Sequence, residues 1–322
     1  MRTFCLLVAV ASGAASQLPD FYQTVARVSW VVSDVDRVTE GWNKTGLARI
    51  QPAREVDLPE VQFRGRVTPV RVRAASGVIG DVPVDFIQPL GGQNAYTEFL
   101  KKHGDGVFSL FHRVPSLDAL GQELARLHGL GVDVLQRGTL EDGSVQYAYL
   151  DTEAQGKYVL GLVYLPPGFT GEPPEPPGRI SQFAFVVRDQ KAVSAYWTRL
   201  GFPGMTYSQG SLRDRRYRGQ PAAYDHILGW QRHGKIPYEW ILPLKGPTVY
   251  NDFLKAHGEG FQHFGVPAED FDKAVADWDK LGYKVSQSGA WGEDGKKGSG
   301  RYAYIDTDAL GGINIELLWN FR

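Results

Sequence analysis

Cysteine is almost absent from this chain: Cys5 is the only one among 322 residues. It lies within residues 1–16, which have the layout of a secretory signal peptide, with a positive charge at Arg2, a short apolar run over 4–11 and small residues before Gln17. Without this segment the chain has no thiol and no disulfide. A cysteine nucleophile and a cysteine-ligated zinc site are therefore excluded, and we expect a secreted or periplasmic protein.

Excess charge and long apolar runs are lacking as well. The 35 Lys and Arg residues nearly balance the 36 Asp and Glu residues, so no overall field indicates a nucleic acid or an anionic membrane as a partner. The apolar run over 4–11 is too short to span a bilayer, and no other stretch is long enough. By contrast, 38 glycines and a 12% share of aromatic residues are typical of a β-rich protein with many turns.

One segment of the chain occurs twice. Residues Val82–Gly106 align without a gap with Ile236–Gly260, and 12 of these 25 positions are identical. The match resumes downstream, where YAYLDT from Tyr147 corresponds to YAYIDT from Tyr302. A repeat of this length indicates a duplicated domain rather than a solenoid built from short units.

A proline-rich stretch, residues 166–178, separates the two copies and predicts a semi-rigid extended linker. The expected domains are therefore residues 22–165 and 179–322. Within the second copy, alternating apolar residues predict strands, and runs with apolar residues at helical spacing predict helices. The expected order is strand 180–187, helix 189–200, three strands ending at 242, strand 260–266, helix 271–281, and strands 284–286, 301–305 and 313–319.

Strand–helix–strand–strand–strand, read twice, is a pair of βαβββ modules. The first copy repeats this pattern from Val25 and from Val107. We therefore predict an α+β fold in which four βαβββ modules form two domains.

The segment Phe253–His263 (FLKAHGEGFQH) resembles the region around a metal-binding histidine of methylmalonyl-CoA epimerase. Through it, and through the duplicated modules, nearly all of the chain after residue 16 resembles the vicinal oxygen chelate superfamily. That superfamily includes glyoxalase I, the epimerase, extradiol dioxygenases and bleomycin-resistance proteins. The resemblance implies that two modules curl into a cupped sheet and hold a metal between the first and last strands of each module.

At those four positions the second copy carries Gln182, Glu239, His263 and Glu316. They are polar residues in otherwise apolar runs, and a buried carboxylate is costly unless a partner compensates its charge. Taken singly, Gln182 could be a satisfied strand residue and His263 a core histidine. Together they are similar to the ligand set of eukaryotic-type glyoxalase I, which implies a divalent metal such as zinc, nickel, cobalt or manganese.

By the same resemblance, Glu316 is expected to act as the catalytic base and Glu239 as its partner on the opposite face. The implied reaction is proton abstraction next to a carbonyl whose adjacent oxygens chelate the metal, giving isomerase, epimerase or lyase chemistry on a small-molecule substrate. Extradiol dioxygenases rely on two histidines and one glutamate, so a single histidine argues against ring cleavage. Two alternatives stay open: a non-catalytic binding protein of the bleomycin-resistance type, and a purely structural domain.

The first copy differs at the same four positions, where it has Arg27, Asp85, Ser109 and Gly161. A cation there would meet one carboxylate and one guanidinium, so we expect the first domain to be free of metal. Arg27 either pairs with Asp85 in place of a metal or points to solvent.

Several other residues are candidates for the surroundings of the site. The arginines of residues 213–218 could bind an anionic group of a substrate, or form a solvated hairpin. The candidates for lining the cup are Trp240, Trp291, Trp319, Tyr302 and Tyr304. Val186 and Glu259 stand where glyoxalase I places arginines against glutathione, so glutathione is not predicted as the substrate.

The remaining histidines fall into two groups. His103 and His257 recur in both copies just before a glycine turn and are predicted to be structural, since the copy without metal ligands keeps its histidine. The sequence indicates no partner for His112, His226 or His233, and it does not indicate an oligomeric state.

Overall fold

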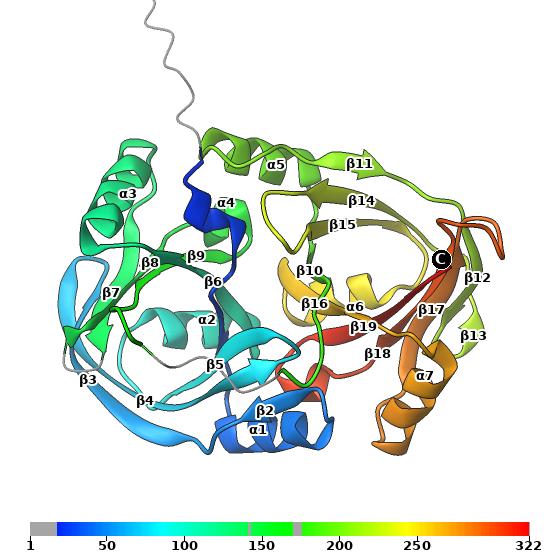
Figure 1. Cartoon of the computed structure of the whole chain (residues 1–322), viewed down its shortest axis with the longest axis horizontal. Coiled ribbons are helices and arrows are strands. Elements are labelled where there is room, and N and C mark those ends of the chain that lie inside the picture. The colour runs from blue at the N-terminus through cyan, green and yellow to red at the C-terminus, as the bar shows by residue number, and fades with distance from the viewer. Residues whose placement is uncertain (1–17, 141–142, 170–175, 322) are drawn as a thin grey trace, which may run out of the picture.

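The computed structural model describes residues 18–140, 143–169 and 176–321. Two curled β-sheets lie side by side, with helices packed inside and around them (Figure 1). This confirms the predicted α+β class with two cupped sheets. The predicted signal peptide at residues 1–16 and residues 170–175 of the predicted linker lie outside the described residues.

The first sheet closes on itself. Its strands are β1 (Arg27–Val31), β2 (Ala48–Ile50), β3 (Arg54–Phe63), β4 (Arg66–Ile79), β5 (Val82–Pro89), β6 (Gly106–Val114), β7 (Val134–Leu140), β8 (Val145–Leu150) and β9 (Val159–Tyr164). They follow the order β2-β4-β3-β7-β8-β9-β6-β1-β5, and the long strand β4 also pairs with β5. The pairing of β3 with β7 on one side and of β4 with β5 on the other makes this sheet a barrel.

The second sheet stays open on one side. Its strands are β10 (Gln182–Val186), β11 (Thr206–Ser208), β12 (Leu212–Tyr217), β13 (Gln220–Pro221), β14 (Asp225–Gln231), β15 (Tyr238–Lys245), β16 (Gly260–Pro267), β17 (Val285–Trp291), β18 (Gly300–Ile305) and β19 (Asn314–Asn320). They follow the order β11-β14-β15-β10-β16-β19-β18-β17-β12-β13. Within the described chain no pairing joins β13 to β11 or β14, so this sheet is a half-barrel.

Helices connect the strands. They are α1 (Val35–Lys44), α2 (Ala95–His103), α3 (Leu117–Gly129), α4 (Glu153–Gly156), α5 (Gln190–Arg199), α6 (Val249–Ala256) and α7 (Phe271–Lys280), with the short 3-10 turns η1 (Asp20–Gln23) and η3 (Asp308–Leu310). Asp189 caps α5 as predicted, because its side chain accepts a hydrogen bond from the backbone N–H of Ala192. No helix in the described ranges is both long and apolar enough to cross a membrane.

Helices α2 and α6, which the sequence analysis did not predict, lie inside the two cups (Figure 1). Tyr96 and Phe99 of α2 pack in the apolar interior of the first sheet. Tyr250 and Phe253, at the matching positions of the repeat, do the same on α6 in the second. The repeated segment is therefore a strand followed by a helix that fills its own cup.

The modules pair within each half of the chain. The first strands of the two modules, β1 and β6, run antiparallel to each other in the first sheet, and β10 and β16 do so in the second. The second module of each half has the predicted βαβββ order. The first module of each half carries additional strands, since β2–β5 follow α1 and β11–β15 follow α5.

A shared apolar core joins the two halves. Trp42 of α1 donates its indole N–H to the carbonyl of Leu310 in η3, at 2.7 Å. At the corresponding place in the other half, Trp197 of α5 donates to the carbonyl of Gly156 in α4, at 3.1 Å. Both indoles are fully buried. Each domain thus inserts a tryptophan against the other, with a hydrogen bond for the polar end of the ring.

Candidate metal centre

The four side chains predicted from the sequence converge inside the second cup. Gln182 Nε2 lies 3.0 Å from Glu239 Oε2, 2.8 Å from Glu316 Oε2 and 3.3 Å from His263 Nε2. His263 Nε2 is 3.4 Å from Glu239 Oε2 and 3.2 Å from Glu316 Oε2. One ligand atom from each of the two glutamates and the histidine falls within 4.8 Å of the others. Four residues up to 134 positions apart in the chain thus meet at one point.

Strand register explains this convergence. Ala184 of β10 lies opposite Glu239 on β15 and opposite His263 on β16. Glu239 and His263 therefore flank the same position of β10. Gln182 is the partner of Gly265, which is in turn the partner of Glu316 on β19. Since partners in register project to the same face of a sheet, all four functional side chains point into the cup.

Gly265 provides the space for this arrangement. A Cβ atom at this position would collide with Cγ of Gln182 and would come within 2.7 Å of its Cδ. A side chain on Gly265 would therefore push Gln182 away from the two carboxylates. The absence of a side chain here is part of the site.

The site is deeply buried and carries opposing charges. The four residues are between 0% and 7% exposed. Burial raises the pKa of Glu239. Burial lowers the pKa of His263, but the charges of Glu316 and Glu239 outweigh it and raise this pKa to about 9. Two carboxylates in a dry cup therefore favour a positive charge between them.

A divalent cation would supply the positive charge that the two carboxylates favour. Two carboxylates, one imidazole and one amide are a donor set suited to zinc and neighbouring divalent metals. The Gln182 amide presents nitrogen to the carboxylates, and a half-turn about its last torsion presents the carbonyl oxygen instead. The residues present thus fit the metal that the sequence implied.

A chain of hydrogen bonds fixes the orientation of His263. Asn314 Nδ2 donates to the carbonyl of Ile305 at 3.1 Å, and Asn314 Oδ1 accepts from Gln262 Nε2 at 2.7 Å. Gln262 Oε1 then accepts from His263 Nδ1 at 2.6 Å. Because the chain ends at a carbonyl, its direction is fixed, and Nδ1 must carry the proton. A neutral His263 therefore presents the lone pair of Nε2 to the centre of the cup.

The sequence analysis did not assign Gln262 and Asn314 a role. Both are polar residues in mostly apolar strands, and Gln262 is fully buried. Their position beside a predicted ligand was the signal that could have found them, since a metal-bound imidazole needs a partner for its second nitrogen.

Tyrosines surround the site inside the cup. The ring of Tyr304 lies 5.0 Å from the ring of His263, in an edge-on arrangement. Its hydroxyl is 2.9 Å from that of Tyr250 on α6, and the hydroxyl of Tyr302 is 2.7 Å from that of Tyr224. Trp291 stacks against Tyr302. The wall of the cup is thus aromatic, with its hydroxyl groups paired to one another.

Two of the predicted lining residues lie elsewhere. Trp240 stacks on Phe185 at 4.3 Å and belongs to the core shared by the two halves. Trp319 also packs against that shared core. The prediction that these two residues line the cup was wrong, because each lies on the opposite face of its strand from the neighbouring glutamate.

The four arginines of residues 213–218 all have partners within the chain. Arg215 donates to the carbonyl of Tyr224, and Arg216 to that of Gly219. Arg218 pairs with Asp252 at 3.1 Å. Arg213 donates to the carbonyl of Gly292. These contacts favour the reading of a hairpin that fixes β12 at the open edge of the sheet.

The first cup has no cation-binding arrangement at the matching positions. Arg27 Nη1 lies 2.6 Å from Asp85 Oδ1, as expected for a salt bridge in place of a metal. The position of Glu316 is taken by Gly161, and that of Gly265 by Phe111. The Phe111 ring covers Gly161 so closely that a Cβ there would lie 2.5 Å from the ring. An aromatic ring thus occupies the space that a carboxylate has in the second cup.

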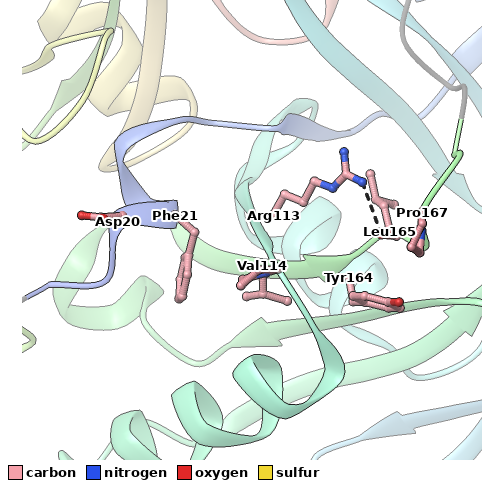
Figure 2. Close-up of a pocket in the computed structure, with 8 residues that line it drawn as sticks. Asp20, Phe21, Arg113, Val114, Tyr164, Leu165 and Pro167 are labelled. Atoms are coloured by element: carbon pink, nitrogen blue, oxygen red, sulfur yellow. Dashed lines mark hydrogen bonds between the residues drawn. The ribbon is translucent and has the colours of Figure 1, made fainter.

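A surface cavity of about 680 Å³ lies away from both cups, between η1, the end of β6 and the segment after β9. Figure 2 shows Phe21 and Tyr164 in its walls and Arg113, whose guanidinium donates to the carbonyl of Leu165 at 3.3 Å. None of the four converging residues lines it. This cavity is therefore separate from the candidate metal centre.

Comparison with known proteins shows which family part of the second domain is similar to. Residues 181–304, which include Gln182, Glu239 and His263, match the family model of the glyoxalase/bleomycin resistance protein/dioxygenase superfamily. No curated protein matches the chain. This part of the second domain is therefore similar to that superfamily, in line with the broad resemblance found in the sequence.

A solved structure shares this fold over nearly the whole chain, and two others align with lower scores. A triple mutant of 4-hydroxymandelate synthase from Streptomyces coelicolor aligns with a TM-score of 0.59 and 17% identity, over 92% of each chain. A halotolerant catechol dioxygenase gives a TM-score of 0.46 and 14% identity, over 93% of this chain and 87% of its own. A catechol 2,3-dioxygenase gives 0.47 and 11%, over 93% and 89%. At these identities, the match to the synthase shows a common two-cup fold and nothing narrower.

Proposed function

We propose that the second domain binds one divalent cation through Gln182, Glu239, His263 and Glu316 and that the protein is a metal-dependent enzyme. Its substrate is a small molecule with two adjacent oxygens, and its reaction removes a proton from carbon next to a carbonyl. The outcome is isomerisation, epimerisation or elimination. The observation that carries this proposal is the meeting of two buried carboxylates, an oriented imidazole and an amide at one point.

The bound cation would polarise the substrate carbonyl and favour negative charge on its oxygens. Zinc, nickel, cobalt and manganese all suit the donor set. The rest of the task falls to the protein. The buried aromatic residues around Tyr304 and Tyr302 would limit the access of water to the site, and the hydrogen-bond chain from His263 to the Ile305 carbonyl keeps the imidazole oriented.

The two glutamates are the candidates for moving the proton. We assign Glu316 as the base and Glu239 as the acid–base partner on the opposite side of the site. Burial raises the pKa of Glu239, which makes its carboxylate a better proton acceptor than one in water. Two carboxylates flanking one bound substrate allow a proton to leave on one face and return on the other.

The donor set distinguishes this proposal from oxygen chemistry. The superfamily includes dioxygenases, and the structural match includes 4-hydroxymandelate synthase. Two histidines and one glutamate are expected for extradiol ring cleavage, whereas this site has one histidine and two glutamates. We therefore favour proton abstraction.

Metal content and proton exchange test the proposal together. Hydroxyacetone is a suitable probe, because its carbonyl and hydroxyl oxygens are adjacent. We expect the metal-loaded full chain to accelerate deuterium incorporation from D2O into its methylene group, as followed by NMR. Glu316→Gln should retain metal yet lose the exchange by about a hundredfold or more. Unchanged exchange in a metal-loaded Glu316→Gln protein would remove the assignment of the base.

A further inference from the structure

A cavity of about 410 Å³ lies between the two domains, behind the candidate metal centre. Four segments meet there: residues 22–25, the β4–β5 turn at Asp81, residues 179–181 and the β14–β15 turn at 233–236. The backbone N–H of Lys235 donates to the carbonyl of Gln23 across this junction, at 3.2 Å. Tyr238 lies at its base and, being adjacent to Glu239 on β15, projects to the convex side of the sheet.

Buried polar atoms without partners gather at the base of this cavity. Neither the hydroxyl of Tyr238 nor Nδ1 of His233 has a hydrogen-bond partner among the described residues, and both residues line the cavity. The two rings are 4.6 Å apart. Tyr238 is 2% exposed. Because nearly all buried polar groups in folded proteins are paired, two neighbouring exceptions beside a cavity point to a ligand that completes them.

A third unpartnered group lies nearby. His112 Nδ1 donates to the carbonyl of Thr24 at 2.9 Å, and Thr24 lines the cavity. The other ring nitrogen of His112 is buried without a partner in the described chain. The ring stacks edge-on against Tyr22, which also lines the cavity. Buried polar atoms without a described partner thus occur in both domains around this cavity.

The mouth of the cavity carries a net positive charge. Arg179 and Lys235 both line it and are exposed, and neither side chain forms a hydrogen bond or an ion pair with another described residue. The one acidic residue in the lining is Asp81, and its carboxylate is already engaged by the backbone N–H of Ile180 at 2.8 Å. Burial lowers the pKa of His233 to about 4, so its ring adds no charge at neutral pH.

The lining is mixed. Val25, Val82, Ile180 and Ile236 contribute aliphatic groups, and Gln23, Thr24 and Ser181 contribute polar ones. A pocket that combines two cations, aliphatic side chains and unpartnered hydrogen-bonding groups fits a small organic anion that carries a further polar group.

We propose that this junction cavity binds a small organic carboxylate that has an apolar body and a polar group at its far end. The carboxylate lies between Arg179 and Lys235, the body lies against Ile180 and Ile236, and the polar group pairs with Tyr238 and His233. This site is separate from the metal centre, since Tyr238 and Glu239 point to opposite faces of the same sheet.

Calorimetric titration of the metal-free full chain with 4-hydroxybenzoate tests this proposal. The chain is first treated with a chelator, so that the carboxylate cannot bind a metal in the second cup. 4-Hydroxybenzamide serves as the ligand control, because it has the same size and lacks the charge. We expect 4-hydroxybenzoate to bind at least about tenfold more tightly than the amide, since charge-assisted hydrogen bonds are the stronger ones.

Three variants locate the binding. The double change Arg179→Gln and Lys235→Gln should weaken 4-hydroxybenzoate binding by about tenfold or more, and Tyr238→Phe should weaken it by a smaller factor. Arg66→Gln with Lys101→Gln is the matched control, because it removes the same two charges from exposed positions of the first domain. His263→Ala should bind the carboxylate as the unaltered chain does, whatever its effect on metal. Absence of binding, equal binding of the amide, or an equal loss in the control would overturn the proposal.

Discussion

His103 and His257 exchange hydrogen bonds across the junction of the two domains. Nδ1 of His103 donates to the carbonyl of His257 at 2.6 Å, and Nδ1 of His257 donates to the carbonyl of His103 at 2.9 Å. Nε2 of each ring faces a carboxylate, Glu153 at 2.7 Å and Asp308 at 2.8 Å. The two residues occupy the same position of the duplicated segment, so the repeat is used twice to build one symmetric contact. The predicted structural role of both histidines agrees with this geometry.

This contact predicts a pH-dependent stability. The His257 ring needs a proton on both nitrogens to donate to the carbonyl of His103 and to Asp308 together. Burial lowers the pKa of His257, but Asp308 and the carbonyl of His103 outweigh it, so the pKa is raised above its usual value. A raised pKa in the folded state means that the stabilisation is complete below the unfolded pKa of about 6.5 and is lost as pH rises through the folded pKa.

We therefore expect the free energy of unfolding to fall between about pH 6 and pH 8 more in the unaltered chain than in Asp308→Asn, by ~1 kcal/mol or less. Denaturant unfolding across this range measures the difference. Glu60→Gln is a control on another exposed carboxylate and should leave the slope unchanged. Identical slopes for the unaltered chain and Asp308→Asn would contradict the role given to His257.

Gly265→Ala should damage the metal centre without unfolding the protein. The added methyl group collides with the stem of Gln182, which must leave its place between the two glutamates. We expect metal affinity to fall by about tenfold or more, because one ligand is displaced. Gly121→Ala in α3 is the matched control: a Cβ there meets no atom within 4 Å, and the change should stabilise the helix by about 1 kcal/mol. Equal metal affinity in the two variants would show that Gln182 is not a ligand.

Gln262 should matter to metal affinity although it lies outside the ligand set. Gln262→Leu removes the acceptor that fixes the proton on His263 Nδ1. Partners of this kind change affinity by about 10–100-fold when removed. The measurement is a competition titration with a chromophoric chelator. The same change at the fully buried Gln136 of the first cup, Gln136→Leu, should leave metal affinity unaltered.

The first cup should contribute stability and no metal. Arg27 and Asp85 form a salt bridge with both side chains partly exposed, at 22% and 25%. Ser76 also donates to Asp85, at 2.5 Å. A double-mutant cycle with Arg27→Met and Asp85→Asn should give a coupling free energy of about 1 kcal/mol, since solvent screens the pair. Metal content should stay the same in all three variants, and a fall in any of them would contradict the structural role.

Much of this architecture could be predicted from the sequence. Strand alternation and helical spacing predicted the modules, and the family resemblance implied that they form two cupped sheets. The convergence of Gln182, Glu239, His263 and Glu316 follows from the same reasoning, since each is an inward position on the first or last strand of a module. Alternation also determines the direction of Trp240 and Trp319. Each lies an odd number of residues from a glutamate that points into the cup, so each must point outward. Both faces of this sheet are buried, and for that reason hydrophobicity alone could not separate them.

Other features depended on contacts that no local pattern encodes. Phe111 and Gly161 replace Gly265 and Glu316 as a complementary pair, and only the register of β6 with β9 shows that they touch. The exchange between His103 and His257 requires two segments 154 residues apart to meet, which depends on how the domains pack. Closure of the first sheet depends on β3 reaching β7 and on β4 pairing with both β3 and β5.

Titration of Zn²⁺ into the chelator-treated full chain tests the central claim most directly. The account predicts a single tight site per chain, absent when Glu239→Gln and Glu316→Gln are combined and retained when Arg27→Met alters the first cup. Stoichiometric zinc in the doubly altered chain, or no binding to the unaltered one, would contradict it.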